Sequence, residues 1–318
     1  MYLLELVGDD DAFAIREARS RASGVEPAAP GLATARGVDA PEALAYTRRI
    51  CRLAGTCDPT VAAAAALVDA AGTDRTGTVA VRARDVRGLS GIDTRAAERR
   101  LGSVLVARGF DVDLDDPDHT LVALFSSDLA AVGWLETRTV RDFSARNPTE
   151  KPFFQPGSMA PMDARALSNV AGAAPGARIL DPMCGTGGVL VEAGLAGASV
   201  VGSDAQRKMV LGARRNLEAY LDGGTVVRGD ATRLPFAADR FDGAVFDAPY
   251  GRQSAIAGDS LETLVEGALA EVKRVATRAV VVGDRPWDDA AVAAGWTVTD
   301  RFDRRVHGSL VRYVHVLA

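Results

Sequence analysis

The sequence predicts an α/β protein whose C-terminal part is a doubly wound, Rossmann-like domain and whose N-terminal part is a smaller α+β region. The first observation is that short apolar, β-branched segments alternate with helical segments after residue 161, which is typical of a mostly parallel sheet covered by helices. The second is a stretch with four prolines, residues 143–161, which separates this regular half from a first half of mixed signals. A chain of 318 residues is long enough for two or three domains.

The first half is expected to contain both strands and helices. Apolar alternation and β-branched residues predict strands at 2–7, 78–84, 111–114 and 120–125, with further extended chain to residue 135. Apolar residues at the helical period predict helices at 13–22, 41–53, 61–70 and 95–108. A proline opens the second of these helices and a glycine ends the last.

The second half repeats strand and helix in regular order. The predicted strands are 177–180, 199–202, 225–228, 243–246 and 279–282. The predicted helices between them are 189–196, 206–221 and 261–276, the last with a clear apolar stripe. Two further strands, 296–302 and 310–317, lie close together in sequence and predict a closing hairpin.

Composition narrows the class of protein. Hydrophobic residues make up 47% and charged residues 25%, as in packed globular chains. The longest wholly apolar run, 61–68, is far shorter than the roughly 20 residues that span a bilayer. The three cysteines form no C-x-x-C pair, the first residues carry acids where a secretory signal is basic, and the three histidines share no metal-ligand spacing. We therefore expect a cytoplasmic protein with no metal and no membrane span, and the sequence leaves its oligomeric state open.

The charge distribution indicates a localised contact with a polyanion. The net charge of −5 argues against a protein that coats nucleic acid indiscriminately. Residues 16–108 nevertheless hold 15 basic and 10 acidic residues, whereas residues 110–150 hold 3 and 9. The candidates for RNA contact are two groups of arginines, namely Arg48, Arg49 and Arg52 on the predicted helix, and Arg82 and Arg84 at the predicted strand. For each group, a solvated surface with ion pairs inside the domain is an equally good interpretation.

The strongest motif is Asp181-Pro-Met-Cys-Gly-Thr-Gly-Gly188, between a predicted strand and a predicted helix. Gly185 and Gly187 let the backbone pass close to a ligand, and the helix N-terminus beyond them offers free amide donors. A dinucleotide fingerprint would need glycine where Leu190 stands, which disfavours an oxidoreductase. An acid followed by this G-x-G suits S-adenosylmethionine, whose ammonium and sulfonium are positive. A tight strand–helix turn without a ligand is the alternative.

Two further acids follow the next predicted strands. Asp204 ends the second strand, where a carboxylate can accept hydrogen bonds from a ribose diol and can equally cap the following helix. Asp230 follows the third strand, where it could reach the adenine amino group or act as an ordinary turn aspartate. Both are candidate cofactor-binding residues.

The motif Asp247-Ala248-Pro249-Tyr250, at the end of the fourth predicted strand, points to methylation of an exocyclic amine on a planar base. Such a nitrogen is a poor nucleophile because its lone pair is delocalised into the ring. Two acceptors aimed at its hydrogens, the Asp247 carboxylate and the Ala248 carbonyl, would favour the pyramidal, attacking form. Pro249 holds Ala248 extended and Tyr250 offers a stacking face. The alternative is a turn that ends the strand with a buried tyrosine.

Taken together, these motifs resemble those of the archaeal tRNA guanine-N2 methyltransferases that act on guanosine 10. The resemblance covers nearly the whole chain and rests on Lys151-Pro-Phe-Phe-Gln-Pro-Gly-Ser-Met159, the glycine motif, Gly202-Ser-Asp204, Gly229-Asp230-Ala, Asp247-Ala-Pro-Tyr250-Gly and the stretch 304–312. It implies a ferredoxin-like segment at 1–55, a tRNA-binding THUMP domain at 56–142, a linker at 143–161 and a Rossmann-fold methyltransferase domain at 162–318.

The resemblance also implies roles for the candidate residues. Asp181, Gly185 and Gly187 would hold S-adenosylmethionine, with Asp204 on its ribose and Asp230 near its adenine, while Asp247 and Tyr250 would hold the target guanine. The family usually has proline where Ala248 stands here, but alanine supplies the same backbone carbonyl. The expected function is methylation, once or twice, of the guanosine N2 amine in tRNA. The alternatives are a guanine-N2 or adenine-N6 enzyme for another RNA site, and a non-catalytic tRNA-binding protein.

Overall fold

The computed structural model describes residues 1–249, 260–307 and 310–318, and the chain divides into two compact units, Met1–Arg141 and Asp142–Ala318. The boundary expected between residues 55 and 56 lies inside a strand, Thr47–Cys57, and the segment 143–161, expected as a linker, lies within the second unit. The assignment of a THUMP domain to residues 56–142 stays a prediction.

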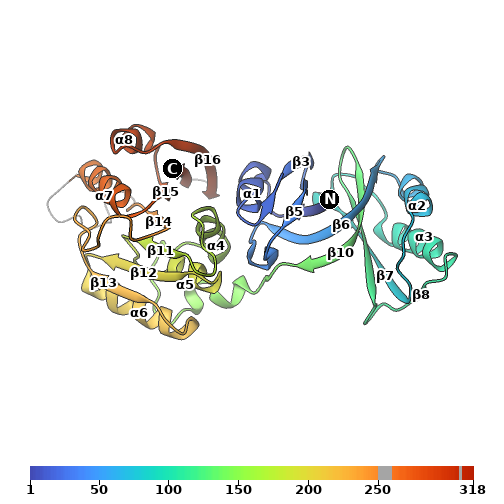
Figure 1. Ribbon diagram of the computed structural model, residues 1–318, viewed down its shortest axis with the longest axis horizontal. Helices are drawn as coiled ribbons and strands as arrows, with labels where there is room; N and C mark the ends of the chain where they lie inside the picture. Colours follow the sequence, from blue (N-terminus) through green and yellow to red (C-terminus); the bar gives the residue numbers. More distant parts are fainter. Residues whose placement is uncertain (250–259, 308–309) are drawn as a thin grey trace. The chain divides into compact units, whose positions relative to one another are not determined.

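The first unit is built on one eight-stranded sheet (Figure 1). Its strands, in order across the sheet, are β3 (Glu26–Ala29), β4 (Leu32–Ala35), β1 (Tyr2–Leu6), β6 (Thr47–Cys57), β10 (Ala130–Arg138), β9 (His119–Phe125), β7 (Thr78–Asp85) and β8 (Asp111–Val112). The short strands β2 (Ala22–Ser23) and β5 (Gly37–Val38) pair separately. The helices are α1 (Asp11–Ala18), α2 (Val61–Ala70) and α3 (Thr94–Val106).

Apolar side chains on the two faces of this sheet belong to separate cores. Along β9, Leu121 and Phe125 belong to the cluster shared with α2 and α3, whereas Val122 and Leu124 belong to a cluster with Leu3 of β1. This alternation follows from the two-residue period of side chains along a strand. One face of the sheet therefore packs against α2 and α3, and the opposite face has a separate apolar cluster.

The predicted helix at 41–53 is wrong. Only Pro41–Ala43 forms a 3₁₀ turn, after which the chain is extended at Leu44 and enters β6. β6 lies between β1 and β10 and hydrogen-bonds to both, so pairing within the sheet overrides the local helical signal. The arginines placed on that helix therefore lie on a central strand.

The second unit is a seven-stranded sheet with helices on both faces (Figure 1). Its strands, in order across the sheet, are β13 (Thr225–Arg228), β12 (Ser199–Asp204), β11 (Arg178–Asp181), β14 (Gly243–Asp247), β15 (Ala279–Gly283), β17 (Leu310–Leu317) and β16 (Val298–His307). The first five are parallel, and the last two form the predicted antiparallel hairpin. The helices are α4 (Pro161–Val170), α5 (Gly188–Leu195), α6 (Arg207–Tyr220), α7 (Leu261–Val275) and α8 (Asp288–Ala293).

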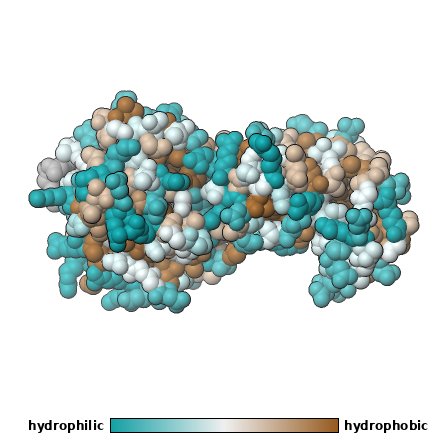
Figure 2. Space-filling model, viewed as in Figure 1, coloured by the Kyte–Doolittle hydropathy of each residue, from teal (hydrophilic) through white to brown (hydrophobic). Residues whose placement is uncertain are grey.

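The predicted Rossmann-like fold is confirmed, and the five parallel strands lie close to their predicted bounds. α4 is a helix that the sequence pattern does not predict, and it begins at the last proline of the segment 143–161. None of the helices in the described residues is both long and apolar enough to cross a membrane. Hydrophilic side chains cover much of the surface drawn in Figure 2, with apolar ones scattered between them.

Candidate active site

Three aspartates lie at the carboxyl edge of the parallel sheet. Asp181 ends β11, Asp204 ends β12 and Asp247 ends β14. The strand order reverses between β11 and β14, and ligands of doubly wound sheets bind in the crevice at such a switch point. Burial raises the pKa of Asp181 well above its usual range, and the negative charges of the other two aspartates raise it further. The three carboxylates therefore share one electrostatic neighbourhood.

The glycine turn between β11 and α5 has a conformation that requires its glycines. Gly185 has φ +49° and Gly187 has φ +75°, both in the left-handed region that side chains other than glycine disfavour. A Cβ at Gly187 would also lie 3.0 Å from Leu217 Cδ1 and 3.1 Å from Ala213 Cβ. The turn can therefore bring bare backbone against a ligand, as the motif predicts.

Asp204 holds this turn in place. Its Oδ2 accepts a hydrogen bond from the Gly185 amide at 3.0 Å, and its Oδ1 accepts one from the Gln206 amide at 2.8 Å. Burial raises the pKa of this carboxyl above its usual value. Each carboxylate oxygen has a further lone pair, so Asp204 can support the turn and still accept hydrogen bonds from a ribose diol.

Asp230 lies two residues beyond β13, next to the end of β12, because the Gly229 amide donates to the backbone oxygen of Asp204 at 3.1 Å. Its side chain is exposed, and Oδ1 accepts hydrogen bonds from the amide and the hydroxyl of Thr232, at 2.9 and 2.8 Å. This is the local turn structure that the sequence analysis weighed as an alternative. A role beside adenine stays a prediction.

The methylation motif begins at the tip of β14. The Ala248 amide donates to the backbone oxygen of Val282 in β15 at 2.8 Å, which extends the strand pairing by one residue past Asp247. Ala248 is buried and the side chain of Asp247 is 21% exposed. Pro249 is the last described residue of the motif, and Tyr250 lies outside the described residues. The structure thus places the two proposed acceptors, Asp247 and Ala248, at the carboxyl end of β14, where the strand order reverses.

Arg312, on β17, is a site residue that the sequence analysis gave no role. Its Nη2 lies 3.7 Å from Asp247 Oδ2, and the residue is only 8% exposed. The sheet brings these two residues together because β17 is added beside β15, which is paired with β14. Only this strand order reveals the pair, since 65 positions in the sequence separate its members.

Asn216, on α6, is a second residue that the sequence analysis missed. Its side-chain amide donates to the backbone oxygens of Phe153 and Thr186, both at 2.8 Å, and its Oδ1 accepts from the Phe153 amide at 2.9 Å. Ser158 Oγ lies 3.2 Å from Thr186 Oγ1. Asn216 therefore ties the segment 143–161 to the glycine turn. The sequence signal for this residue is an asparagine at a position that belongs to the apolar stripe of the helix.

Three of the candidate RNA-binding arginines surround one buried acid in the first unit. Glu5 of β1 is 3% exposed, and its carboxylate lies 3.0 Å from Arg49 Nε, 2.9 Å from Arg84 Nε and 3.9 Å from Arg48 Nε. Arg49 is largely buried, whereas the side chains of Arg48 and Arg84 are 35% and 37% exposed. We call Glu5 and these three arginines the Glu5 cluster. Because three positive charges surround one negative charge, the cluster has a net positive charge.

The remaining two arginines make other contacts. Arg52 pairs with Glu136 at 3.2 Å, and its guanidinium lies 4.4 Å from the centre of the Tyr2 ring. Arg82 donates to the backbone oxygen of Leu114 at 2.7 Å. In the described ranges, no three His, Cys, Asp or Glu side chains come together as metal ligands.

Comparison with known proteins agrees with this geometry. The family model described as UPF0020, RMKL-like, methyltransferase domain matches residues 148–313. The tRNA (guanine(10)-N2)-dimethyltransferase of Methanothermobacter thermautotrophicus is 35% identical over 73% of this chain and 71% of its own, and that of Pyrococcus abyssi is 34% identical over 76% and 74%. The solved structure of TrmN from Thermus thermophilus is similar in fold, with a TM-score of 0.52 and 22% identity over 99% of this chain and 98% of its own. The chain therefore belongs to the family of tRNA (guanine(10)-N2)-dimethyltransferases and carries an RMKL-like methyltransferase domain.

Proposed function

We propose that this protein is an S-adenosylmethionine-dependent enzyme that methylates the exocyclic N2 amine of guanosine 10 in tRNA, twice, in the cytoplasm. The observation that carries the proposal is the joint position of the glycine turn and of Asp247-Ala248 at the switch between β11 and β14. The position in tRNA and the second methyl group follow the names of the two archaeal relatives.

The cofactor fits the residues around the glycine turn. Asp181 is a buried carboxylate at that turn whose pKa burial raises, and the positive groups of the cofactor would offset that cost. We assign Gly185 and Gly187 to the turn that holds S-adenosylmethionine. Asp204 would accept hydrogen bonds from its ribose, and Asp230 would contact its adenine amino group. S-adenosylmethionine supplies an electrophilic methyl group on its sulfonium.

The target amine is activated by two hydrogen-bond acceptors. In the proposed complex, the Asp247 carboxylate and the Ala248 carbonyl accept the two N2 hydrogens, which draws the nitrogen lone pair out of the guanine ring. Pro249 fixes the direction of the carbonyl, and Tyr250 stacks on the base. Transfer is a direct displacement: the bond between N2 and the methyl carbon forms as the bond from that carbon to sulfur breaks, and S-adenosylhomocysteine leaves. The proton that N2 loses passes to the Asp247 carboxylate, and positioning supplies much of the acceleration.

The decisive experiment maps the methylated nucleoside. The protein is incubated with labelled S-adenosylmethionine and a tRNA transcript, and the digested RNA is analysed by chromatography and mass spectrometry. We expect N2-methylguanosine first and N2,N2-dimethylguanosine later, both lost when guanosine 10 is replaced by adenosine. Label in adenine, or label that persists in the position-10 variant, would contradict the proposal.

The substitution Asp181→Asn is expected to affect stability and cofactor binding in opposite directions. Because the folded-state pKa of Asp181 is raised, its ionised form lowers stability as the pH rises above the pKa of the unfolded chain. The neutral amide keeps an acceptor for the Met183 amide, which lies 3.1 Å from Oδ1. We expect Asp181→Asn to raise the Tm of the cofactor-free protein at pH 7.5 by a few degrees, and to weaken binding of S-adenosylhomocysteine at least about tenfold. Thermal unfolding and calorimetric titration measure the two effects, and a variant that loses Tm would contradict the first.

For the tRNA we propose a phosphate contact at the Glu5 cluster, with Arg52 and Arg82 nearby in the same unit. Arg48 and Arg84 are exposed enough to reach a phosphate, whereas Arg49 remains paired with Glu5. The double change Arg48→Ala and Arg84→Ala leaves that pair intact. We expect it to raise the Kd for tRNA about tenfold and to flatten the slope of log Kd against log salt concentration by roughly 1 to 2.

The charge-matched control changes both Arg99 and Arg100 of α3 to alanine, which also removes two exposed positive charges. This helix packs on the face of the sheet opposite the apolar cluster that contains Leu3. We expect this control to change neither the Kd nor its salt slope appreciably. An equal effect in the control and in the double variant would show that only net charge matters and would remove the Glu5 cluster as a binding site.

A further inference from the structure

Lys151 is a buried cation at the glycine turn. The residue is 6% exposed, and its Nζ is enclosed without a hydrogen-bond partner among the described residues. A Cβ placed on Gly188, the first residue of α5, would lie 3.1 Å from that Nζ. Burial lowers the pKa of Lys151, as expected for an ammonium removed from water without full compensation.

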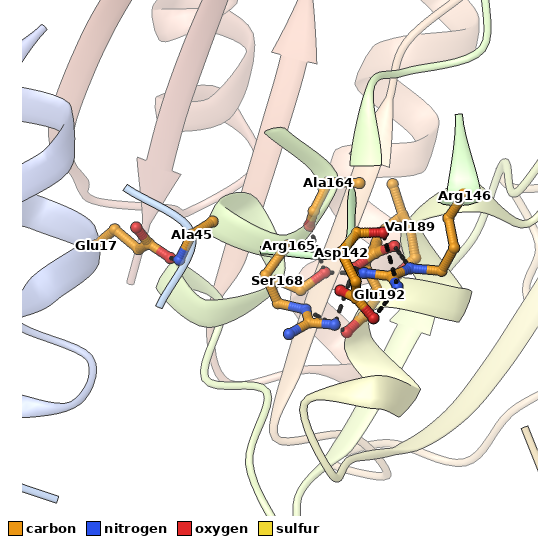
Figure 3. A network of polar contacts seen from close by, with 9 residues as sticks. All are labelled: Glu17, Ala45, Asp142, Arg146, Ala164, Arg165, Ser168, Val189 and Glu192. Carbon is orange, nitrogen blue, oxygen red and sulfur yellow. Dashed lines mark hydrogen bonds and ion pairs between the residues drawn. The ribbon is translucent and has the colours of Figure 1, made fainter. Parts of the chain in front are cut away.

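Glu192 and Arg146, whose charges act on the pKa of Lys151, belong to a group of side chains whose charges match one another. Figure 3 shows this group, which also contains Asp142 and Arg165. Glu192 of α5 is fully buried, and its two carboxylate oxygens lie 2.7 Å from Arg146 Nε and 2.9 Å from Arg165 Nη2. Asp142 pairs with Arg146 at 2.8 Å. These two acids balance the two arginines, so the ammonium of Lys151 is the surplus positive charge of the group.

The N-terminus of α5 adds a partial positive charge next to the ammonium of Lys151. The first amide groups of a helix have no partner within the helix and attract negative charge. Here they begin at Gly188, beside the unpaired ammonium. Two independent features therefore point to one small anion at the same place.

The segment that carries Lys151 is held firmly. The backbone of Phe153 makes two hydrogen bonds with Asn216, and its ring lies where a Cβ on Gly212 would have to be, 2.0 Å from ring carbon Cδ1. Lys151 is only two residues away, so the backbone that carries its side chain is anchored at the glycine turn.

We propose that Lys151 and the N-terminus of α5 form the subsite for the carboxylate of the methionine part of S-adenosylmethionine. The inference rests on the proposed function, which places this cofactor at the turn. A zwitterionic amino acid needs a cation for its carboxylate and an anion for its ammonium, and the turn is bordered by Lys151 and by Asp181. An RNA phosphate is disfavoured because the proposed function places the tRNA base at Asp247 and Tyr250, whereas Lys151 lies beside the first residue of α5, at the turn assigned to the cofactor.

The test compares two ligands that differ only in the carboxylate. Binding of S-adenosylhomocysteine, and of the analogue in which hydrogen replaces its carboxylate, is measured by calorimetry for the wild type and for Lys151→Met. We expect the substitution to raise the Kd of S-adenosylhomocysteine about tenfold to a hundredfold, and to leave the Kd of the analogue within about twofold. Lys151→Gln is expected to give the same pattern, so the result does not depend on one variant.

Lys208→Met is the control, because Lys208 is exposed on α6 and contacts the same Phe153, with its Nζ 5.9 Å from the ring centre. It should leave both affinities unchanged. Equal weakening of both ligands by Lys151→Met, or no weakening of either, would overturn the carboxylate subsite alone. Failure of the wild type to bind S-adenosylhomocysteine at all would instead overturn the proposed function.

Discussion

Asparagine at position 247 is expected to lower kcat for tRNA methylation about a thousandfold or more, while the Kd for S-adenosylhomocysteine stays within about twofold of the wild type. The amide keeps an oxygen that can accept one substrate hydrogen, but it lacks the negative charge that stabilises the positive charge developing on the nitrogen, and it cannot take up a proton. Asp247 lies at the tip of β14, outside the glycine turn that is assigned to the cofactor. Its loss therefore removes activation of the amine without removing the binding site of the methyl donor.

The control for this prediction is Asp242→Asn. Asp242 immediately precedes β14 at its other end and accepts a hydrogen bond from the Arg178 amide at 2.8 Å. Its substitution should leave kcat unchanged. Single-turnover rates with saturating cofactor and tRNA measure the effect on the chemical step. A normal rate in Asp247→Asn would mean that the motif does not activate the amine.

The parallel sheet and its site residues are predictable because their signals are local. Each strand is a short apolar run, and each functional aspartate is the last residue of such a run or closely follows it. Carboxyl ends of parallel strands meet at one edge, so the order of motifs in the sequence already places Asp181, Asp204 and Asp247 together. The left-handed glycines of the turn follow from the same spacing.

The remaining features depend on contacts between distant segments. β6 carries a helical signal, yet its position between β1 and β10 decides its structure. Arg312 becomes a neighbour of Asp247 only through the order of strands in the sheet. Lys151 lies in a proline-rich stretch that predicts a connector, and its burial against α5 depends on the hold of Asn216 on Phe153. Pattern and propensity carry no information about such pairings.

The largest effect on stability is expected from Glu192→Gln. This change removes the buried negative charge that lies against Arg146 and Arg165, whose side chains are 6% and 4% exposed. Breaking a buried ion pair from one side leaves uncompensated charge in the interior and costs about 3 to 5 kcal/mol in the free energy of unfolding. Lys151 adds to the excess positive charge that this change leaves, because its ammonium also loses the attraction of the Glu192 carboxylate.

Asp142→Asn provides the matched comparison. Asp142 contacts the same Arg146, at 2.8 Å, but its side chain is 57% exposed. Water screens that pair, so we expect a loss below about 1 kcal/mol. Urea unfolding followed by tryptophan fluorescence measures both variants. A Trp134→Phe background confines the signal to Trp287 and Trp296, which lie in the second unit with Glu192.

The double variant Lys151→Met, Glu192→Gln tests whether the imbalance of charge, rather than lost packing, causes the instability. Glutamine has nearly the shape of glutamate, so packing around position 192 is little changed. If charge is the cause, removing the surplus ammonium restores part of the lost free energy, and the double variant is more stable than Glu192→Gln alone. Strict additivity of the two changes would mean that Lys151 and Glu192 act independently, and that the ammonium is not part of the charge group around α5.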